Sequence, residues 1–126
     1  CIIHAPEKLP PQVRRDEAGQ VDIFPTAAGL AGIEYTNWTL GRDLFSGTQK
    51  QERGAFISGK NDSPIRFVLD GYCYFDNRAG QISLFKLDDN SGNDYREEGP
   101  ERFAHMRELA EAIQTTSKYW LYNNKK

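Results

Sequence analysis

The sequence predicts an α+β fold, in which an antiparallel β-meander sheet is followed by one C-terminal amphipathic helix packed on it. Between Arg66 and Leu87, apolar and aromatic residues recur at every second position, which is typical of strands. Beyond Pro100, apolar residues recur at helical spacing instead. The chain has 126 residues, which is the length of one domain and enough to bury a core.

The segment from Arg66 to Leu87 is the centre of the predicted sheet. The residues Asp76–Gly80 interrupt its two-residue period and have turn chemistry, because Asn and Gly adopt positive φ readily. We therefore expect consecutive strands on either side of a tight turn. The pairs that share a face within each predicted strand are Phe67 and Leu69, Tyr72 and Tyr74, Cys73 and Phe75, and Ile82 and Leu84.

The residues before this segment predict shorter elements. Val21–Phe24 alternates as a short strand that Pro25 ends. The small, Gly-rich Thr26–Gly32 predicts a turn or one helical turn. Ile33–Phe45 predicts a strand with a bend near Thr36–Asn37, where its apolar residues change parity. A polar connection at Ser46–Glu52, a strand at Arg53–Ser58 and a turn at Gly59–Pro64 complete this part.

The predicted helix begins at Gly99–Pro100, since proline is favoured at the first helical position and the neighbouring glutamates suit the helix dipole. Its apolar face is carried by residues such as Phe103, Met106 and Ile113. We expect the helix to end around Thr115–Ser117, where β-branched and hydroxyl residues weaken it. The aromatic residues 119–122 then predict a final strand or a docked aromatic segment.

The first residues of the chain predict a flexible tether. Residues 1–20 are rich in proline and charge and show almost no apolar periodicity, so they cannot bury enough surface to offset the entropy cost of ordering. We therefore expect a tether over residues 1–20 and a single globular domain over residues 21–126.

Composition argues against several classes of partner. A net charge of −2 lacks the basic excess of nucleic-acid-binding proteins, so no nucleic-acid partner is expected. No apolar run reaches the roughly 20 residues that a membrane-spanning helix needs.

Catalytic and metal motifs also find little support. Gly54–Asn61 has the spacing of a phosphate-binding loop, but its interior predicts a strand where a helix should begin. His4 and His105 lack the clustered partners of a zinc site, and His105 falls off the apolar helix face. Cys73 lies between tyrosines in a strand, which favours packing over reactivity. We expect no enzyme activity, no metal and no cofactor.

The strongest candidate for a functional site is the acidic loop, Asp88–Glu98, which holds five carboxylates against the single cation of Arg96. Carboxylates around a tyrosine are suited to recognising a basic or metal-containing partner. A solvated loop without function and a weak calcium site are the alternatives. An EF-hand is excluded, because Gly92 at its sixth position would put Leu87 at the first. The predicted partner-binding residues are Asp88, Asp89, Asn90, Asn93, Asp94, Tyr95, Glu97 and Glu98.

A leading cysteine, a proline-rich tether and a folded domain together resemble a mature bacterial lipoprotein. The resemblance implies that Cys1 carries the lipid and forms no disulfide with Cys73, and that Ile2, in place of Asp, directs sorting to the outer membrane. Several acyl chains would anchor the chain, since each buried methylene contributes about 0.8 kcal/mol. The alternative is that Cys1 marks an arbitrary boundary of the sequence.

Cys1, the tether around Pro6–Pro11 and a small β-rich domain also resemble the immunity lipoproteins that neutralise type VI secretion effectors of the muramidase type. That resemblance implies a non-catalytic periplasmic protein that plugs the substrate groove of a secreted peptidoglycan hydrolase. Its membrane contact would be the lipid anchor only. A structural envelope lipoprotein that scaffolds an outer-membrane or secretion complex is the alternative, and a small enzyme with a cleft between the helix and the sheet is a third.

Overall fold

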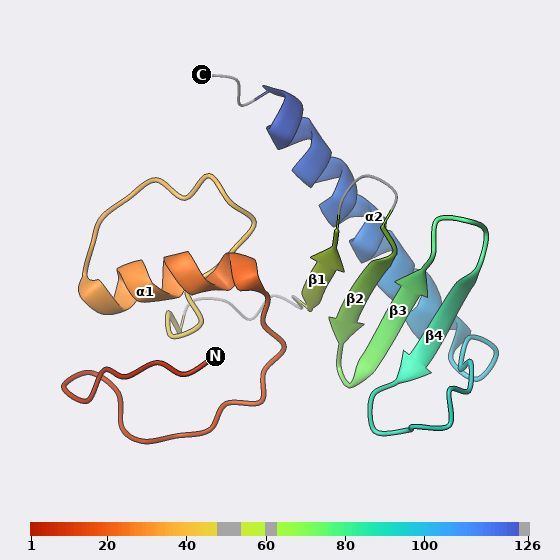
Figure 1. The fold of residues 1–126 in the computed structure, drawn as a ribbon, viewed down its shortest axis with the longest axis horizontal. Helices are drawn as coiled ribbons and strands as arrows, with labels where there is room; N and C mark the ends of the chain where they lie inside the picture. The colour runs from red at the N-terminus through yellow and green to blue at the C-terminus, as the bar shows by residue number, and fades with distance from the viewer. Residues whose placement is uncertain (48–53, 60–62, 124–126) are drawn as a thin grey trace. The chain divides into compact units, whose positions relative to one another are not determined.

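The computed structural model describes residues 1–47, 54–59 and 63–123. The chain divides into two compact units, residues 1–51 and residues 52–126, and each is described by itself. The predicted α+β fold is confirmed: the chain has a four-stranded antiparallel sheet, a short helix that precedes it and a long helix that follows it and contacts the sheet (Figure 1).

The sheet of the second unit is a simple meander. Its strands are β1 (Ala55–Ser58), β2 (Ile65–Leu69), β3 (Tyr72–Asp76) and β4 (Ile82–Lys86). Each strand pairs antiparallel with the next, so the order in space is the order in the sequence. The strands β2, β3 and β4 lie where the alternating pattern predicted them, and β1 lies within the strand predicted at Arg53–Ser58.

Two tight turns connect β2 to β3 and β3 to β4. Asp70 and Gly71 have φ of 50° and 77°, and two positive φ values suit the right-handed twist of a two-residue hairpin. In the turn between β3 and β4, Arg78 and Gly80 adopt positive φ, at 63° and 98°. Asn77, which was expected to do so, instead accepts hydrogen bonds from two backbone N–H groups of the same turn.

The core of the second unit lies between one face of the sheet and the long helix. The register places Phe67 opposite Tyr74 and Tyr74 opposite Leu84, and all three side chains are buried. Burial of such side chains contributes about 1.5–3 kcal/mol each before cavity and strain effects. The buried residues of this core are Ile65, Phe67, Leu69, Tyr74, Leu84, Met106 and Ala110.

The long helix α2 spans Pro100–Asn123 and begins where it was predicted to begin. It is longer than predicted: the expected end at Thr115–Ser117 and the expected strand or docked segment at residues 119–122 are wrong, because the helix continues through them. Hydroxyl residues cost only tenths of a kcal/mol each in a helix. Ser117 donates its hydroxyl to the carbonyl oxygen of Ile113 at 2.8 Å, so it is satisfied inside the helix.

The first unit contains a short 3₁₀ helix, Gln20–Asp22, which leads into the helix α1, Ile23–Ala31. The strand predicted at Val21–Phe24 is therefore wrong. Pro25 does not end the element, because it lies in the first turn of α1, where backbone N–H groups have no partner within the helix. Gly32 ends α1 with a φ of 69°.

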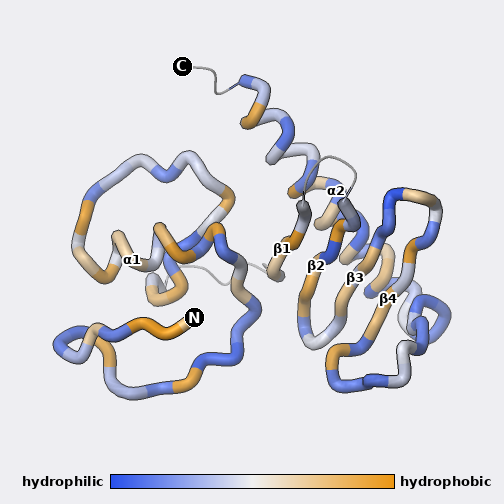
Figure 2. Tube along the Cα trace, in the orientation of Figure 1, coloured by the Kyte–Doolittle hydropathy of each residue, from blue (hydrophilic) through white to orange (hydrophobic). Residues whose placement is uncertain are grey.

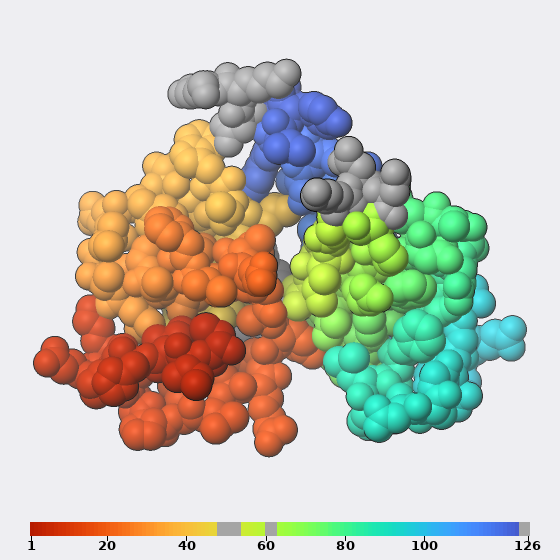
Figure 3. Space-filling model, viewed as in Figure 1, coloured from red at the N-terminus to blue at the C-terminus, as the bar shows by residue number. Residues whose placement is uncertain are grey.

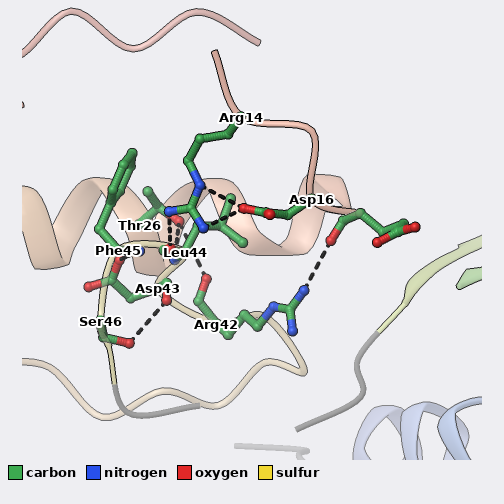
Figure 4. Close-up of polar contacts among 9 residues, drawn as sticks. Arg14, Asp16, Thr26, Arg42, Asp43, Leu44, Phe45 and Ser46 are labelled. Atoms are coloured by element: carbon green, nitrogen blue, oxygen red, sulfur yellow. Dashed lines mark hydrogen bonds and ion pairs between the residues drawn. The ribbon is translucent and has the colours of Figure 1, made fainter. Parts of the chain in front are cut away.

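The strand predicted at Ile33–Phe45 is also wrong, since this segment has no regular secondary structure. Its second half is bound to the helical segment by polar side chains instead of by a strand partner. The carboxylate of buried Asp22 accepts a hydrogen bond from the backbone N–H of Arg42 at 2.8 Å. The hydroxyl of buried Thr26 accepts one from the N–H of Leu44 at 3.1 Å (Figure 4).

Residues of the predicted tether contact this segment as well. Arg14 forms an ion pair with Asp16 and donates a hydrogen bond to the carbonyl oxygen of Leu44. Arg42 donates to the carbonyl oxygen of Glu17 at 3.0 Å (Figure 4). The predicted boundary between residues 20 and 21 stays a prediction. Parts of the polar connection predicted at Ser46–Glu52, of the strand predicted at Arg53–Ser58 and of the turn predicted at Gly59–Pro64 lie outside the described residues.

Candidate functional site

The acidic loop, Asp88–Glu98, connects β4 to α2. It is mostly hydrophilic along its length (Figure 2) and lies at the surface of its unit (Figure 3). Sequence reasoning assigned all its carboxylates and Tyr95 to one recognition surface. In the structure these residues form two groups: one holds the loop in shape through hydrogen bonds, and the other is exposed.

Asp89 organises the first half of the loop. Its carboxylate accepts hydrogen bonds from the backbone N–H and the hydroxyl of Ser91 and from the hydroxyl of Tyr95, the last at 2.6 Å. These bonds, led by the hydroxyl of Ser91, lower the pKa of Asp89 to about 2. The same contact raises the pKa of Tyr95, because its proton is held by the carboxylate. The ionised carboxylate of Asp89 therefore links Ser91 to Tyr95 across the loop, and we call this set of hydrogen bonds the Asp89 brace.

Asp94 and Tyr95 attach the second half of the loop to the edge of the sheet. The backbone N–H of Leu84 donates to the carboxylate of Asp94 at 3.1 Å. The carbonyl oxygen of Leu84 accepts from the N–H of Tyr95 at 2.7 Å. Both backbone groups of a residue in the outermost strand β4 are thus satisfied by the loop, which covers this edge at that position.

Several hydrogen-bond donors stabilise the ionised form of the Asp94 carboxyl group. Burial acts to raise the pKa of its carboxyl group, but hydrogen bonds from the backbone N–H groups of Leu84 and Arg96 and from the side chains of Ser83 and Arg96 outweigh it. The net effect lowers the pKa of Asp94. Arg96 donates its Nε–H to this carboxylate at 2.8 Å.

Three of the eight predicted site residues therefore use their polar atoms in contacts within the loop or with β4: Asp89, Asp94 and Tyr95. The other five are exposed, and the side chain of Asp88 is 75% exposed even though it lies 3.6 Å from the ammonium of Lys86. Their binding to a partner stays a prediction. These five residues are Asp88, Asn90, Asn93, Glu97 and Glu98; Asp94 is exposed as well, although its carboxylate is hydrogen-bonded.

The loop also forms one wall of an open cleft of about 740 Å³. Tyr95 and Glu98 contribute this wall, and the turn between β2 and β3 and the first turns of α2 contribute the others. The guanidinium of Arg102 lies 4.3 Å from the ring centroid of Tyr72, where a cation is attracted to the ring face. The cleft thus combines carboxylates, one guanidinium and two aromatic rings.

Sequence reasoning missed the residues that face this cleft from outside the loop. Asp70 and Tyr72 precede the loop by more than 15 residues, and the hairpin between β2 and β3 brings them to the cleft, whereas Arg102 reaches it from the first turn of α2. His105 also lines the cleft and is exposed, as its place off the apolar helix face predicted. No local pattern marks these residues as one group.

The two cysteines lie in different environments. Cys1 is exposed and Cys73 is buried in β3, and both are free thiols. Burial raises the pKa of the Cys73 thiol, against a smaller lowering effect of the Arg66 charge. The prediction that Cys73 packs as a small hydrophobe is confirmed, because its side chain is buried in β3 at 8% exposure.

The remaining motifs have plain structural explanations. The residues Ala55–Ser58 inside the phosphate-loop spacing form strand β1, as predicted, and residues 60–62 lie outside the described residues. Within the described part of the chain, no three His, Cys, Asp or Glu side chains gather closely enough to hold a metal ion. In the same residues, no helix is both long and apolar enough to cross a membrane.

Comparison with models of known protein families and with curated protein sequences finds no match to this chain.

Proposed function

We propose that this chain is a non-catalytic binding protein whose acidic loop occludes the substrate groove of a secreted cell-wall-degrading hydrolase, as an immunity protein does. The observation that carries the proposal is that different residues of the loop have different roles. Asp89, Asp94 and Tyr95 hold its shape, and the exposed Asp88, Glu97 and Glu98 carry charge outward.

The exposed side chains of the loop carry negative charge, because the only basic residue of the loop, Arg96, already contacts other side chains of the same unit. Arg96 pairs with Asp94 at 2.8 Å, and its guanidinium lies 5.9 Å from the ring centroid of Phe103. Glu97 and Glu98 therefore present carboxylates that Arg96 does not neutralise, and Asp88 presents one beside the ammonium of Lys86 at 3.6 Å. Such a surface favours a basic partner and raises the rate of encounter with it.

The shape of the loop lowers the cost of binding. Association normally loses free energy to the ordering of loops and side chains. Here the brace at Asp89 and the attachment to Leu84 fix both halves of the loop before a partner arrives. The helix α2 follows directly, with Pro100 at its first position. A loop fixed in this way presents its charges in one arrangement.

A hydrolase groove that binds an anionic cell-wall polymer presents cationic side chains to it. The exposed carboxylates of the loop match such a groove, and the cleft beside Tyr95 and Glu98 offers a recess for a projecting side chain of the partner. The predicted acylation of Cys1, the periplasmic location and the attachment to the outer membrane belong to the same proposal and rest on the resemblance to immunity lipoproteins.

The experiment replaces the three exposed carboxylates together, as Asp88→Asn, Glu97→Gln and Glu98→Gln, and measures inhibition of the hydrolase encoded beside this chain. We expect affinity to fall by roughly tenfold or more, mostly through a slower association rate whose dependence on salt is reduced. The stability of the protein should be unchanged, because these side chains are exposed.

The matched control carries the same change of charge elsewhere, at the exposed carboxylates Glu7→Gln, Glu34→Gln and Glu108→Gln. It should inhibit like the unmodified protein. Equal inhibition by both triple variants would move the interface away from the loop. Co-purification with membrane components, in place of a soluble hydrolase, would favour the envelope scaffold instead.

A further inference from the structure

The helix α2 is longer than the sheet that it packs against. Ile113 is the last of its residues to pack against the core. The next residue, Gln114, accepts a hydrogen bond from Arg78 of the hairpin turn at 3.1 Å. The helix then continues to Asn123, over about 15 Å at its normal rise, and passes beyond the ends of the strands (Figure 1).

The aromatic end of α2, residues 119–122, exposes large apolar side chains in four consecutive positions. The exposed fractions are 64% for Tyr119, 36% for Trp120, 74% for Leu121 and 69% for Tyr122. Consecutive helical residues are about 100° apart, so these four side chains surround the helix on all sides. Isolated exposed apolar residues are ordinary, but a contiguous group of this kind marks an interaction surface.

The same stretch of sequence is basic. Residues 114–126 contain three lysines, at positions 118, 125 and 126, and no acidic residue. Their charge is therefore +3 in a chain whose net charge is −2, which leaves −5 for all the other residues. In the sequence, the positive charge is thus concentrated next to the exposed apolar residues 119–122.

We propose that the aromatic end of α2 docks on a membrane surface that contains anionic phospholipids. Trp and Tyr prefer the boundary between headgroups and acyl chains, because their rings are apolar and their N–H or O–H remains hydrated. Lysine attracts anionic headgroups and extends its ammonium into water. The end of α2 combines both features around Trp120 and Lys118.

Two other occupants fit this surface less well. A protein groove takes one stripe of a helix, at spacings of three and four residues, whereas residues 119–122 point in all directions. A second copy of the chain would bring the same positive charge of residues 114–126 to the contact, and like charges oppose it. A lipid interface surrounds the helix end and supplies the opposite charge.

The experiment uses the full chain with two background changes. Cys1→Ser removes the predicted acylation site, so that no acyl chain contributes to binding. Trp38→Phe removes the other of the two tryptophans, so that Trp120 is the only tryptophan reporter. The probes are vesicles of phosphatidylcholine alone and vesicles of phosphatidylcholine with phosphatidylglycerol. Co-sedimentation measures binding, and the emission maximum of Trp120 measures its transfer out of water.

We expect binding and a blue shift of Trp120 emission with the anionic vesicles, and both should weaken as salt is added. Lys118→Gln should weaken binding about fivefold, as the loss of one cation near an anionic surface does. Leu121→Ser should weaken it further. The matched controls are Arg15→Gln and Leu87→Ser, which remove an exposed charge and an exposed leucine elsewhere and should bind normally.

Three outcomes would overturn the proposal. The first is no co-sedimentation and no blue shift with anionic vesicles. The second is equal binding to both kinds of vesicle, since the charge would then play no part. The third is a protein that does not bind vesicles but dimerises with increasing concentration in sedimentation. If Leu121→Ser abolished that dimerisation, the surface would be assigned to a second copy of the chain. None of these results bears on the acidic loop, so the proposed inhibitory function is tested separately.

Discussion

Asp89 stabilises the acidic loop most strongly while its carboxyl group is ionised. The carboxylate accepts hydrogen bonds from Ser91 and from Tyr95, and a protonated carboxyl group would lose part of this acceptor capacity. Ionised acceptors also form the stronger bonds. The structure of the loop is therefore linked to pH.

The pKa of Asp89 is about 2 in the folded protein, below the value of about 3.9 in an unfolded chain. The stabilisation from Asp89 is therefore fully present above about pH 4 and is lost as the pH falls toward 2. We expect Asp89→Asn to lower the melting temperature at neutral pH, and the difference from the unmodified protein should shrink over this window. Thermal unfolding at a series of pH values measures it, and NMR titration of the Asp89 carboxyl carbon measures the pKa directly.

Tyr95→Phe is the matched variant for this titration. It removes one of the donors to Asp89 and leaves Ser91 in place, so the pKa of Asp89 should rise part of the way toward its ordinary value. An Asp89 carboxyl group that titrates near 4 in the unmodified protein would show that the brace does not form in solution.

The acidic composition of the loop predicted its position and its net charge, but not the separate roles of its residues. Asp88 and Asp89 are neighbours in the sequence and look equivalent there. Only Asp89 reaches Tyr95, because the turn at Ser91 brings residues six positions apart together. A sequence-based choice of neutralising mutations would have mixed loop-shaping residues with exposed ones.

At the scale of elements, Met106 joins α2 to the sheet. Its side chain is 1% exposed and lies among the apolar side chains of the core, and α2 makes its contacts with the sheet through β2 and β3. Flexible methionine fills irregular space between a helix and a twisted sheet well. Since the acidic loop ends where α2 begins, docking of α2 also fixes the end of the loop.

We expect Met106→Ala to lower the free energy of unfolding by about 2–5 kcal/mol, because the core would retain a cavity. Chemical denaturation followed by circular dichroism measures this loss. Glu108→Ala, two residues away on the exposed side of the same helix, should change the stability by less than about 0.5 kcal/mol. Similar losses in both variants would mean that α2 does not pack on the sheet through Met106.

Elements with a regular apolar period were predictable, and elements defined by tertiary polar contacts were not. Burial alternates along β2, whereas β3 and β4 each bury two consecutive residues, Cys73 with Tyr74 and Ser83 with Leu84, so the two-residue period of the sequence located these strands without giving the burial of both faces. The segment Ile33–Phe45 has strand-forming residues, but its backbone partners are the side chains of Asp22 and Thr26. That pairing leaves no mark in the local sequence, so propensity alone predicted a strand.

At the scale of the whole molecule, the large apolar core belongs to the second unit. Every residue of the core cluster lies between Ile65 and Ala110. Among the described residues of the first unit, the buried side chains are small or polar, as with Thr26, Ala28 and Asp22. Since burial of apolar surface is the main stabilising term in folding, the second unit holds most of the stability that this chain needs.

We therefore expect residues 52–126, produced alone, to unfold cooperatively at a temperature close to that of the main transition of the full chain. Residues 1–51 alone should show no cooperative transition, since fewer than about 60 residues with small buried side chains form a weak core. Calorimetry of the two fragments and the full chain tests this expectation.

The fragment 52–126 also carries the entire acidic loop, and the proposed function predicts that it inhibits the neighbouring hydrolase with nearly the affinity of the full chain. A folded fragment that fails to inhibit would place part of the interface in residues 1–51, where Asp22 and Arg42 connect α1 and residues 33–45 by hydrogen bonds. Since folding is measured independently in each fragment, loss of inhibition can be separated from loss of structure.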